Sequence, residues 1–126
     1  MNVIGAGSSL LLSEPPLYKP HLWFVLTDPE EKLDRVVGVM LRTVTKNTDE
    51  TVILGPGDHP FIKHASSVHY STAKWFSVEA LTKAMQKGRC HLRETMTPEL
   101  LVRVREGLLE SPFTVRAVSE YCGARF

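Results

Sequence analysis

The chain has 126 residues, of which 43% are hydrophobic and 23% are charged, and its formal net charge at pH 7 is +1. This length suits one domain with a single hydrophobic core, and the composition excludes a disordered or fibrous chain. The near-neutral charge disfavours strong nonspecific DNA binding, so a nucleic-acid partner would have to meet a local basic patch.

The sequence predicts neither a targeting segment nor a disulfide framework. The apolar run Leu10–Leu12 is too short for a signal-peptide core or a membrane span. Two cysteines, Cys90 and Cys122, are too few for a disulfide framework. We therefore expect a cytoplasmic protein with reduced thiols and no membrane partner.

Residues 1–20 are rich in Gly, Ser and Pro, and their three prolines disfavour a helix. The sequence therefore predicts a flexible N-terminal arm over 1–20, which docks through its leucines, and a single domain over 21–126. Leu22–Thr27 and Val36–Val44 are rich in β-branched and aromatic residues and are predicted strands. After a polar loop, Thr51–Leu54 is a third predicted strand, and the short connection predicts an antiparallel hairpin with Val36–Val44.

The second half of the chain predicts short strands and three helices. The strands are Ser67–Tyr70, Ala73–Phe76 and Arg89–Glu94. One helix follows the capping residue Ser77 and stops at Gly88, the next runs from the capping residue Thr97 to Pro112, and the last lies within Phe113–Tyr121. Strands with short connections followed by helices predict an α+β fold, a small antiparallel barrel or curled sheet with packed C-terminal helices.

The stretch GPGDHPFIKHASSVHY, from Gly55 to Tyr70, holds three histidines, an aspartate, a lysine and two serines. It is open to three interpretations: an active site, a polar turn, or a metal site built from Asp58, His59 and His64. The histidines recur every five residues, which fits neither one strand face nor the i, i+4 pair of a helical zinc site. Trp23 and Trp75 are either core residues or a platform for RNA bases.

The segment DRVVGVMLRTVTKNTDETVILGPGDHP resembles the core hairpin of the MazF/PemK-like toxin family. Further on, SSVHYSTAKW looks like the family's strand leading toward a helix, and TMTPELLVRVREGLLES is similar to its C-terminal helix. The resemblance covers roughly Leu22 to Ser111. It implies an SH3-like barrel, usually a homodimer, which cleaves single-stranded RNA without a metal or other cofactor and is held inactive by a small antitoxin.

In such ribonucleases the 2′-hydroxyl attacks the adjacent phosphate, so the site needs a base, an acid and a cation. Arg35 matches the family's strand-opening arginine, whereas Asp58 and His59 stand where the family usually has a Thr or Ser. The hypothesis is that Arg35 stabilises phosphate charge, His59 moves the proton and Asp58 orients one of them, all in one pocket.

Four further residues are candidates for binding the RNA backbone, with a solvated surface as the alternative: Lys63, His64, Arg42 and Lys46. The alternative function is a noncatalytic interaction or RNA-binding module on the same barrel. The geometry of two residues separates these functions. If Arg35 and His59 lie within hydrogen-bond reach across a pocket, the enzyme is favoured; if they point apart, the binding module is.

Overall fold

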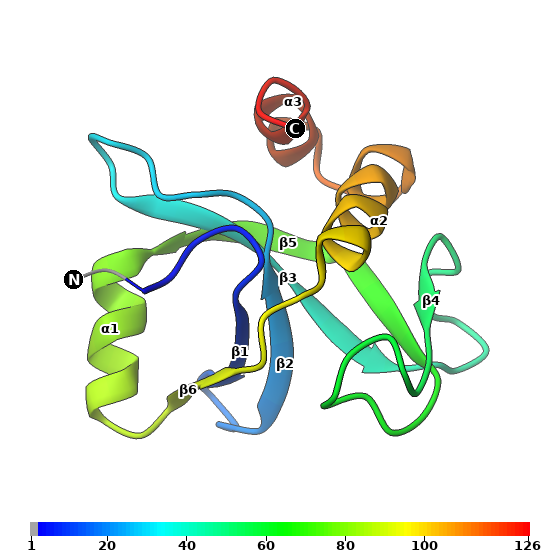
Figure 1. Cartoon of the computed structure of the whole chain (residues 1–126), viewed down its shortest axis with the longest axis horizontal. Coiled ribbons are helices and arrows are strands. Elements are labelled where there is room, and N and C mark those ends of the chain that lie inside the picture. The colour runs from blue at the N-terminus through cyan, green and yellow to red at the C-terminus, as the bar shows by residue number, and fades with distance from the viewer. Residues whose placement is uncertain (1–2) are drawn as a thin grey trace.

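A computed structural model describes residues 3–126 and shows an α+β fold (Figure 1). Within these residues six strands form one antiparallel sheet in the order β4-β5-β3-β2-β1-β6, which curls into a half-barrel. The strands are β1 Ser9–Ser13, β2 Pro20–Val25, β3 Arg35–Thr43, β4 Ile53–Leu54, β5 Ser66–Ser77 and β6 Cys90–Arg93. The predicted class and the curled sheet are confirmed.

The three predicted helices are also present: α1 Val78–Gln86, α2 Pro98–Glu110 and α3 Arg116–Gly123. Two of them begin as their capping residues predict. The Ser77 hydroxyl accepts the N–H of Ala80 at 3.2 Å, and the Thr97 hydroxyl accepts the N–H of Leu100 at 3.2 Å. No helix in the described part of the chain is long and apolar enough to span a membrane.

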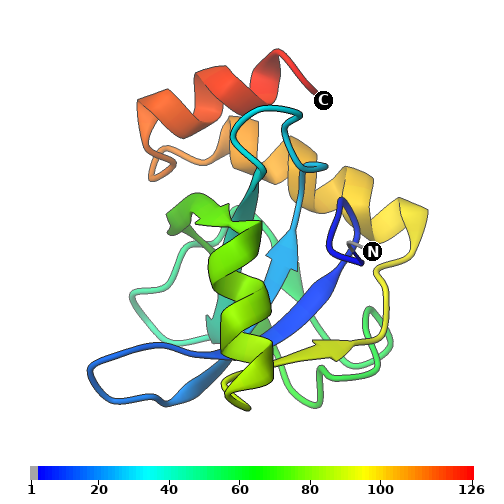
Figure 2. The same cartoon turned by 90° about the vertical axis from the view of Figure 1, so that its left-hand side faces the viewer.

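The helices cover two faces of the sheet, α1 on one side and α2 with α3 on the other (Figure 2). Each side holds its own apolar cluster. Phe24, on β2, belongs to the cluster under α2, whereas its neighbour Trp23 belongs to the cluster under α1. Because successive side chains of a strand point to opposite faces, the part of β2 from Leu22 to Val25 is buried on both faces and is an unbroken apolar run.

The expectation of a flexible arm over 1–20 is wrong for the residues of β1. This strand pairs with both β2 and β6, and Leu10 and Leu12 are buried within their own chain. The alternation of buried and half-buried residues fits a strand, and the prolines at 15 and 16 lie in the connection that follows it. Leu10 and Leu12 are therefore buried as part of the sheet and not as a docked arm.

The predicted hairpin between the second and third strands is also wrong, because β5 lies between β3 and β4. On one side β5 pairs Ser66 with Thr43 of β3, and on the other it pairs Ser67 with Ile53 of β4. Two predicted short strands merge into β5. Thr72, in the polar segment between them, accepts the N–H of Met40 through its hydroxyl at 3.1 Å, so the sheet continues across that segment.

Asp49 joins the loop after β3 to the end of α2. Its carboxylate accepts the backbone N–H of Thr51 at 2.8 Å and the hydroxyl of Ser111 at 2.7 Å. Burial alone would raise the pKa of Asp49, but these hydrogen bonds outweigh it and hold that pKa below its ordinary value. The buried carboxylate is therefore a fully partnered structural link.

Candidate functional site

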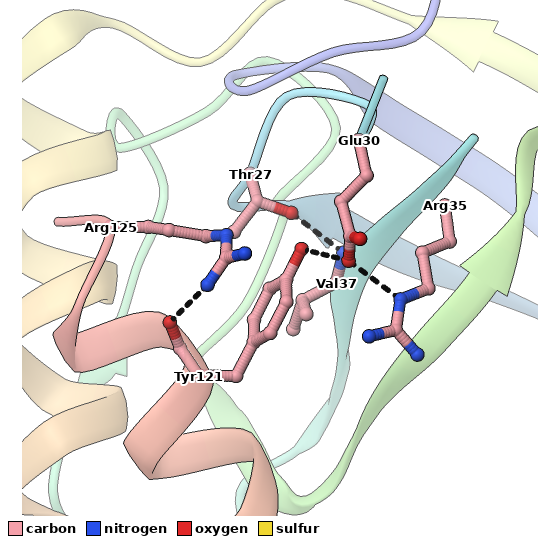
Figure 3. A network of polar contacts seen from close by, with 6 residues as sticks. All are labelled: Thr27, Glu30, Arg35, Val37, Tyr121 and Arg125. Carbon is pink, nitrogen blue, oxygen red and sulfur yellow. Dashed lines mark hydrogen bonds and ion pairs between the residues drawn. The ribbon is translucent and has the colours of Figure 1, made fainter. Parts of the chain in front are cut away.

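Arg35 lies at the start of β3, within a network that attaches α3 to the sheet (Figure 3). Its Nε donates to Glu30 Oε1 at 2.6 Å, and the Tyr121 hydroxyl donates to the same oxygen at 2.5 Å. The guanidinium carbon is 4.7 Å from the centroid of the Trp75 ring. Hydrogen bonds from Tyr121 and Arg35 lower the pKa of Glu30. Arg35 thus has a structural role in joining β3 to the loop before it, to β5 and, through Glu30, to α3.

His59 is a buried anchor rather than a surface proton carrier, with only 2% of its surface exposed. Its Nδ1 accepts the N–H of Phe61 at 3.1 Å, so the ring proton lies on Nε2. Nε2 is 2.7 Å from the carbonyl oxygen of Glu94 and 3.0 Å from the hydroxyl of Ser9. Nε2 therefore fastens the loop after β4 to β1 and to the segment after β6, whereas Nδ1 makes a hydrogen bond within the loop itself.

Asp58 is a turn residue. Its Oδ2 accepts the N–H of Gly55 at 2.8 Å, three residues earlier, and the N–H of Asp58 itself donates to the carbonyl of Gly55 at 3.1 Å. Its other oxygen is 3.6 Å from a terminal nitrogen of Arg103. The polar-turn interpretation is confirmed for this residue.

The structure does not bring Arg35, Asp58 and His59 into one pocket, so that expectation is wrong. The His59 ring packs 5.5 Å from the ring of Phe24, which is paired with Val39. Val39 is four residues along β3 from Arg35, a distance of about 13 Å in a strand. The expectation failed because β4 adds to the sheet beside β5 and not beside β3, so the loop after β4 lies away from the start of β3.

Three of the four predicted RNA-binding residues do converge, on a pocket of about 340 Å³. They are Arg42, Lys63 and His64, and two residues that the sequence had assigned to the arm and its border, Lys19 and His21, line the same pocket. We call these five residues the basic pocket. Within residues 3–126, no Asp or Glu lines it. Lys46, the fourth candidate, lines a different pocket together with Asp49 and Glu50.

The basic pocket opens where two neighbouring strands separate. The last paired residues of β2 and β3 at this end are Trp23 and Met40, and the pocket lies beyond them, between residues 19–22 and 41–43. Residues 61–64, from the loop after β4, line it as well. His64 Nε2 is 3.0 Å from the Thr43 hydroxyl, which ties this loop to the end of β3.

Sequence reasoning missed Lys19, His21 and Phe61 as members of this site. The signal available was a lysine and a histidine just before a predicted strand, in LYKPHLW, where Lys19 falls in the predicted arm and His21 begins the predicted domain. Nothing local in the sequence shows that this start meets the end of β3. Only the antiparallel pairing of β2 with β3 does so.

The metal site, the two tryptophans and the two cysteines are the other features that the sequence singled out. No three His, Cys, Asp or Glu side chains among residues 3–126 are grouped as metal ligands would be. Trp23 is buried against Phe76, as the core interpretation predicts, and Trp75 packs edge-on against Tyr121. Both cysteines are buried free thiols, and burial raises the pKa of each to about 11.

No family model, curated protein or solved structure matches the chain.

Proposed function

We propose that the chain is a single-stranded RNA-binding domain and that the basic pocket holds RNA phosphates. One observation carries the proposal: cationic and imidazole side chains from three separate segments line one pocket. Among residues 3–126, no carboxylate lines this pocket. Lysine and arginine next to an otherwise uncharged cavity attract phosphate oxygens and can form charge-assisted hydrogen bonds with them.

The local character of the charge also supports this function. The net charge of the chain is only +1, so binding depends on this pocket and not on a general basic field. The separation of Arg35 from His59 favours a binding module over the predicted catalytic arrangement. The curled six-stranded sheet is compatible with the SH3-like barrel that the resemblance to MazF/PemK-like toxins implies, and single-stranded RNA is the ligand that it implies.

The double variant Arg42→Ala/Lys63→Ala tests the proposal. We expect it to bind a short single-stranded RNA at least about tenfold more weakly than the wild type, with a reduced dependence of log affinity on log salt, because two phosphate contacts are lost. Fluorescence anisotropy of a labelled oligonucleotide across a salt series measures both quantities.

The matched control is Lys83→Ala/Arg116→Ala, which removes the same charge from α1 and α3. Both of these side chains are exposed and pair only with a glutamate four residues away among the ion pairs of the described residues. Equal loss of affinity in the two double variants would show that net charge, and not the basic pocket, binds RNA.

A second candidate function is a metal-independent endoribonuclease, and the pair of histidines in the basic pocket favours it. His21 and His64 both line the pocket, beside Arg42 and Lys63. Histidine exchanges protons most readily near neutral pH, so one ring can take the proton of the 2′-hydroxyl while the other protonates the leaving 5′-oxygen. The neighbouring cations stabilise the phosphorane.

If this second function is correct, His21→Ala and His64→Ala should each slow RNA cleavage by about a hundredfold or more. The assay uses purified protein with a chelator present, and RNA binding is measured in parallel so that lost affinity is not mistaken for lost catalysis. His91→Ala, an exposed histidine on β6, is the control. A wild-type protein that binds RNA but never cleaves it would remove the endoribonuclease and leave the binding module.

We also propose a cytoplasmic location, as the cysteine content predicts. The resemblance implies a homodimer and a small antitoxin as well, and both belong to the endoribonuclease proposal, because an RNA-binding module needs no inhibitor.

A further inference from the structure

The loop between β4 and β5 is held so firmly that it presents a fixed surface. His59 accepts the N–H of Phe61 through Nδ1, and its carbonyl accepts the N–H of Ile62 at 3.0 Å. The side chain of Ile62 is buried in the large apolar cluster under α2. Because these contacts lie on both sides of Phe61, its backbone has little freedom.

Phe61 is nevertheless exposed, with 38% of its surface accessible to solvent, although Ile62 beside it is buried. Its ring lies 5.5 Å from the guanidinium carbon of Arg93, on β6. Phe61 also lines the basic pocket, next to Lys63 and His64. An exposed aromatic ring on an anchored backbone, beside the cationic side chains of the basic pocket, combines the two elements that single-stranded nucleic-acid sites use.

We propose that Phe61 is a base-stacking residue: an unpaired RNA base lies on its ring while the adjoining phosphate is held in the basic pocket. This inference rests on the proposed RNA binding and defines the substrate class more narrowly. The bases of a duplex are already stacked on one another, so the ring selects single strands with accessible bases. His59 acts through Phe61 as a positioning residue, by fixing the backbone that carries the ring.

Two probes separate stacking from phosphate binding. The first is a short oligoadenylate, which has both bases and phosphates, and the second is an abasic oligonucleotide of the same length, which keeps only the phosphates and sugars. We expect Phe61→Leu, which keeps the apolar bulk but removes the ring, to bind oligoadenylate about tenfold more weakly. Its affinity for the abasic strand should stay within about twofold of the wild type, since the phosphate contacts remain.

Rescue and control variants sharpen the comparison. Phe61→Trp, which restores an aromatic face, should bind oligoadenylate at least as tightly as the wild type. Phe113→Leu removes a more exposed ring, at 59% exposure, from the connection between α2 and α3, and should change neither affinity. Thermal unfolding of each variant shows that all remain folded.

The outcomes distinguish this inference from the function on which it rests. If wild type binds both probes and Phe61→Leu binds oligoadenylate unchanged, stacking is overturned and RNA binding stands. If Phe61→Leu weakens both probes equally, Phe61 supports the pocket rather than a base, and stacking is again overturned. If the wild type binds neither probe, the RNA-binding function itself fails, and the stacking role fails with it.

Discussion

Replacing His59 with alanine should destabilise the fold by about 3–5 kcal/mol, because a buried ring is lost and its partners are left without hydrogen bonds. The partners are the N–H of Phe61, within the loop after β4, and the carbonyl of Glu94 and the hydroxyl of Ser9, which join that loop to the segment after β6 and to β1. This result differs from the catalytic hypothesis, which predicts that His59→Ala slows cleavage by about a hundredfold or more with little change in folding.

Urea unfolding, followed by circular dichroism, measures the change in the free energy of unfolding. His91→Ala is the matched control, because this exposed histidine interacts only with the nearby carbonyl of Gly88 among the hydrogen bonds of the described residues. We expect that control to change stability by less than about 0.5 kcal/mol. An unchanged unfolding midpoint for His59→Ala would contradict the anchoring role.

Replacing Gly107 with valine should destabilise the protein by about 3 kcal/mol or more, although valine has the higher helix propensity. Gly107 lies in α2, where it faces β5 at close range. A Cβ atom there would stand 2.2 Å from the Tyr70 hydroxyl oxygen and 2.5 Å from a methyl carbon of Val52. Tyr70 has no room to withdraw, because it is fully buried and its hydroxyl donates to the carbonyl of Val104 at 2.8 Å.

The stability of Gly107→Ala should fall between those of the wild type and Gly107→Val. The higher helix propensity of alanine stabilises the helix by about 1 kcal/mol, but the steric overlap of its Cβ atom with Tyr70 and Val52 costs more. Gly55→Val is the control, because a Cβ at Gly55 would meet no described atom within 4 Å. Calorimetric melting temperatures of the three variants give the order. A Gly107→Val protein that melts at the wild-type temperature would show that α2 moves away from β5 without cost.

The helices could be predicted from the sequence because their signals are local. Ser77 and Thr97 cap the helices that they precede, and Pro112 follows the C-cap residue of the second helix, Ser111. Strand pairing depends on residues far apart in the chain, and the pairing that the sequence predicted was wrong. The proximity of two apolar segments in the chain predicted a hairpin, but β5 pairs with both and separates them.

The candidate site also shows that local sequence does not predict which distant residues come together. Asp58 and His59 look reactive as neighbours in the sequence, yet the fold uses one in a turn and buries the other. Arg42, Lys63 and His64 were identified from the sequence as phosphate-binding candidates, and the structure places them together. Their shared pocket could not be predicted, because it depends on where β2 and β3 stop pairing.

The pairing of β1 with β6 has a consequence for how the protein is made. Ser9 lies opposite Arg93, so the sheet joins residues near the start of the chain to residues synthesised more than eighty positions later. A ribosome releases the chain from its N-terminus, at about 5–20 residues per second, so several seconds separate the emergence of β1 from that of its partner. Until then one edge of β1 is unpaired and the apolar cluster under α1 lacks Cys90. The sheet is therefore completed only after β6 has been synthesised, and until then the nascent chain carries an open strand edge.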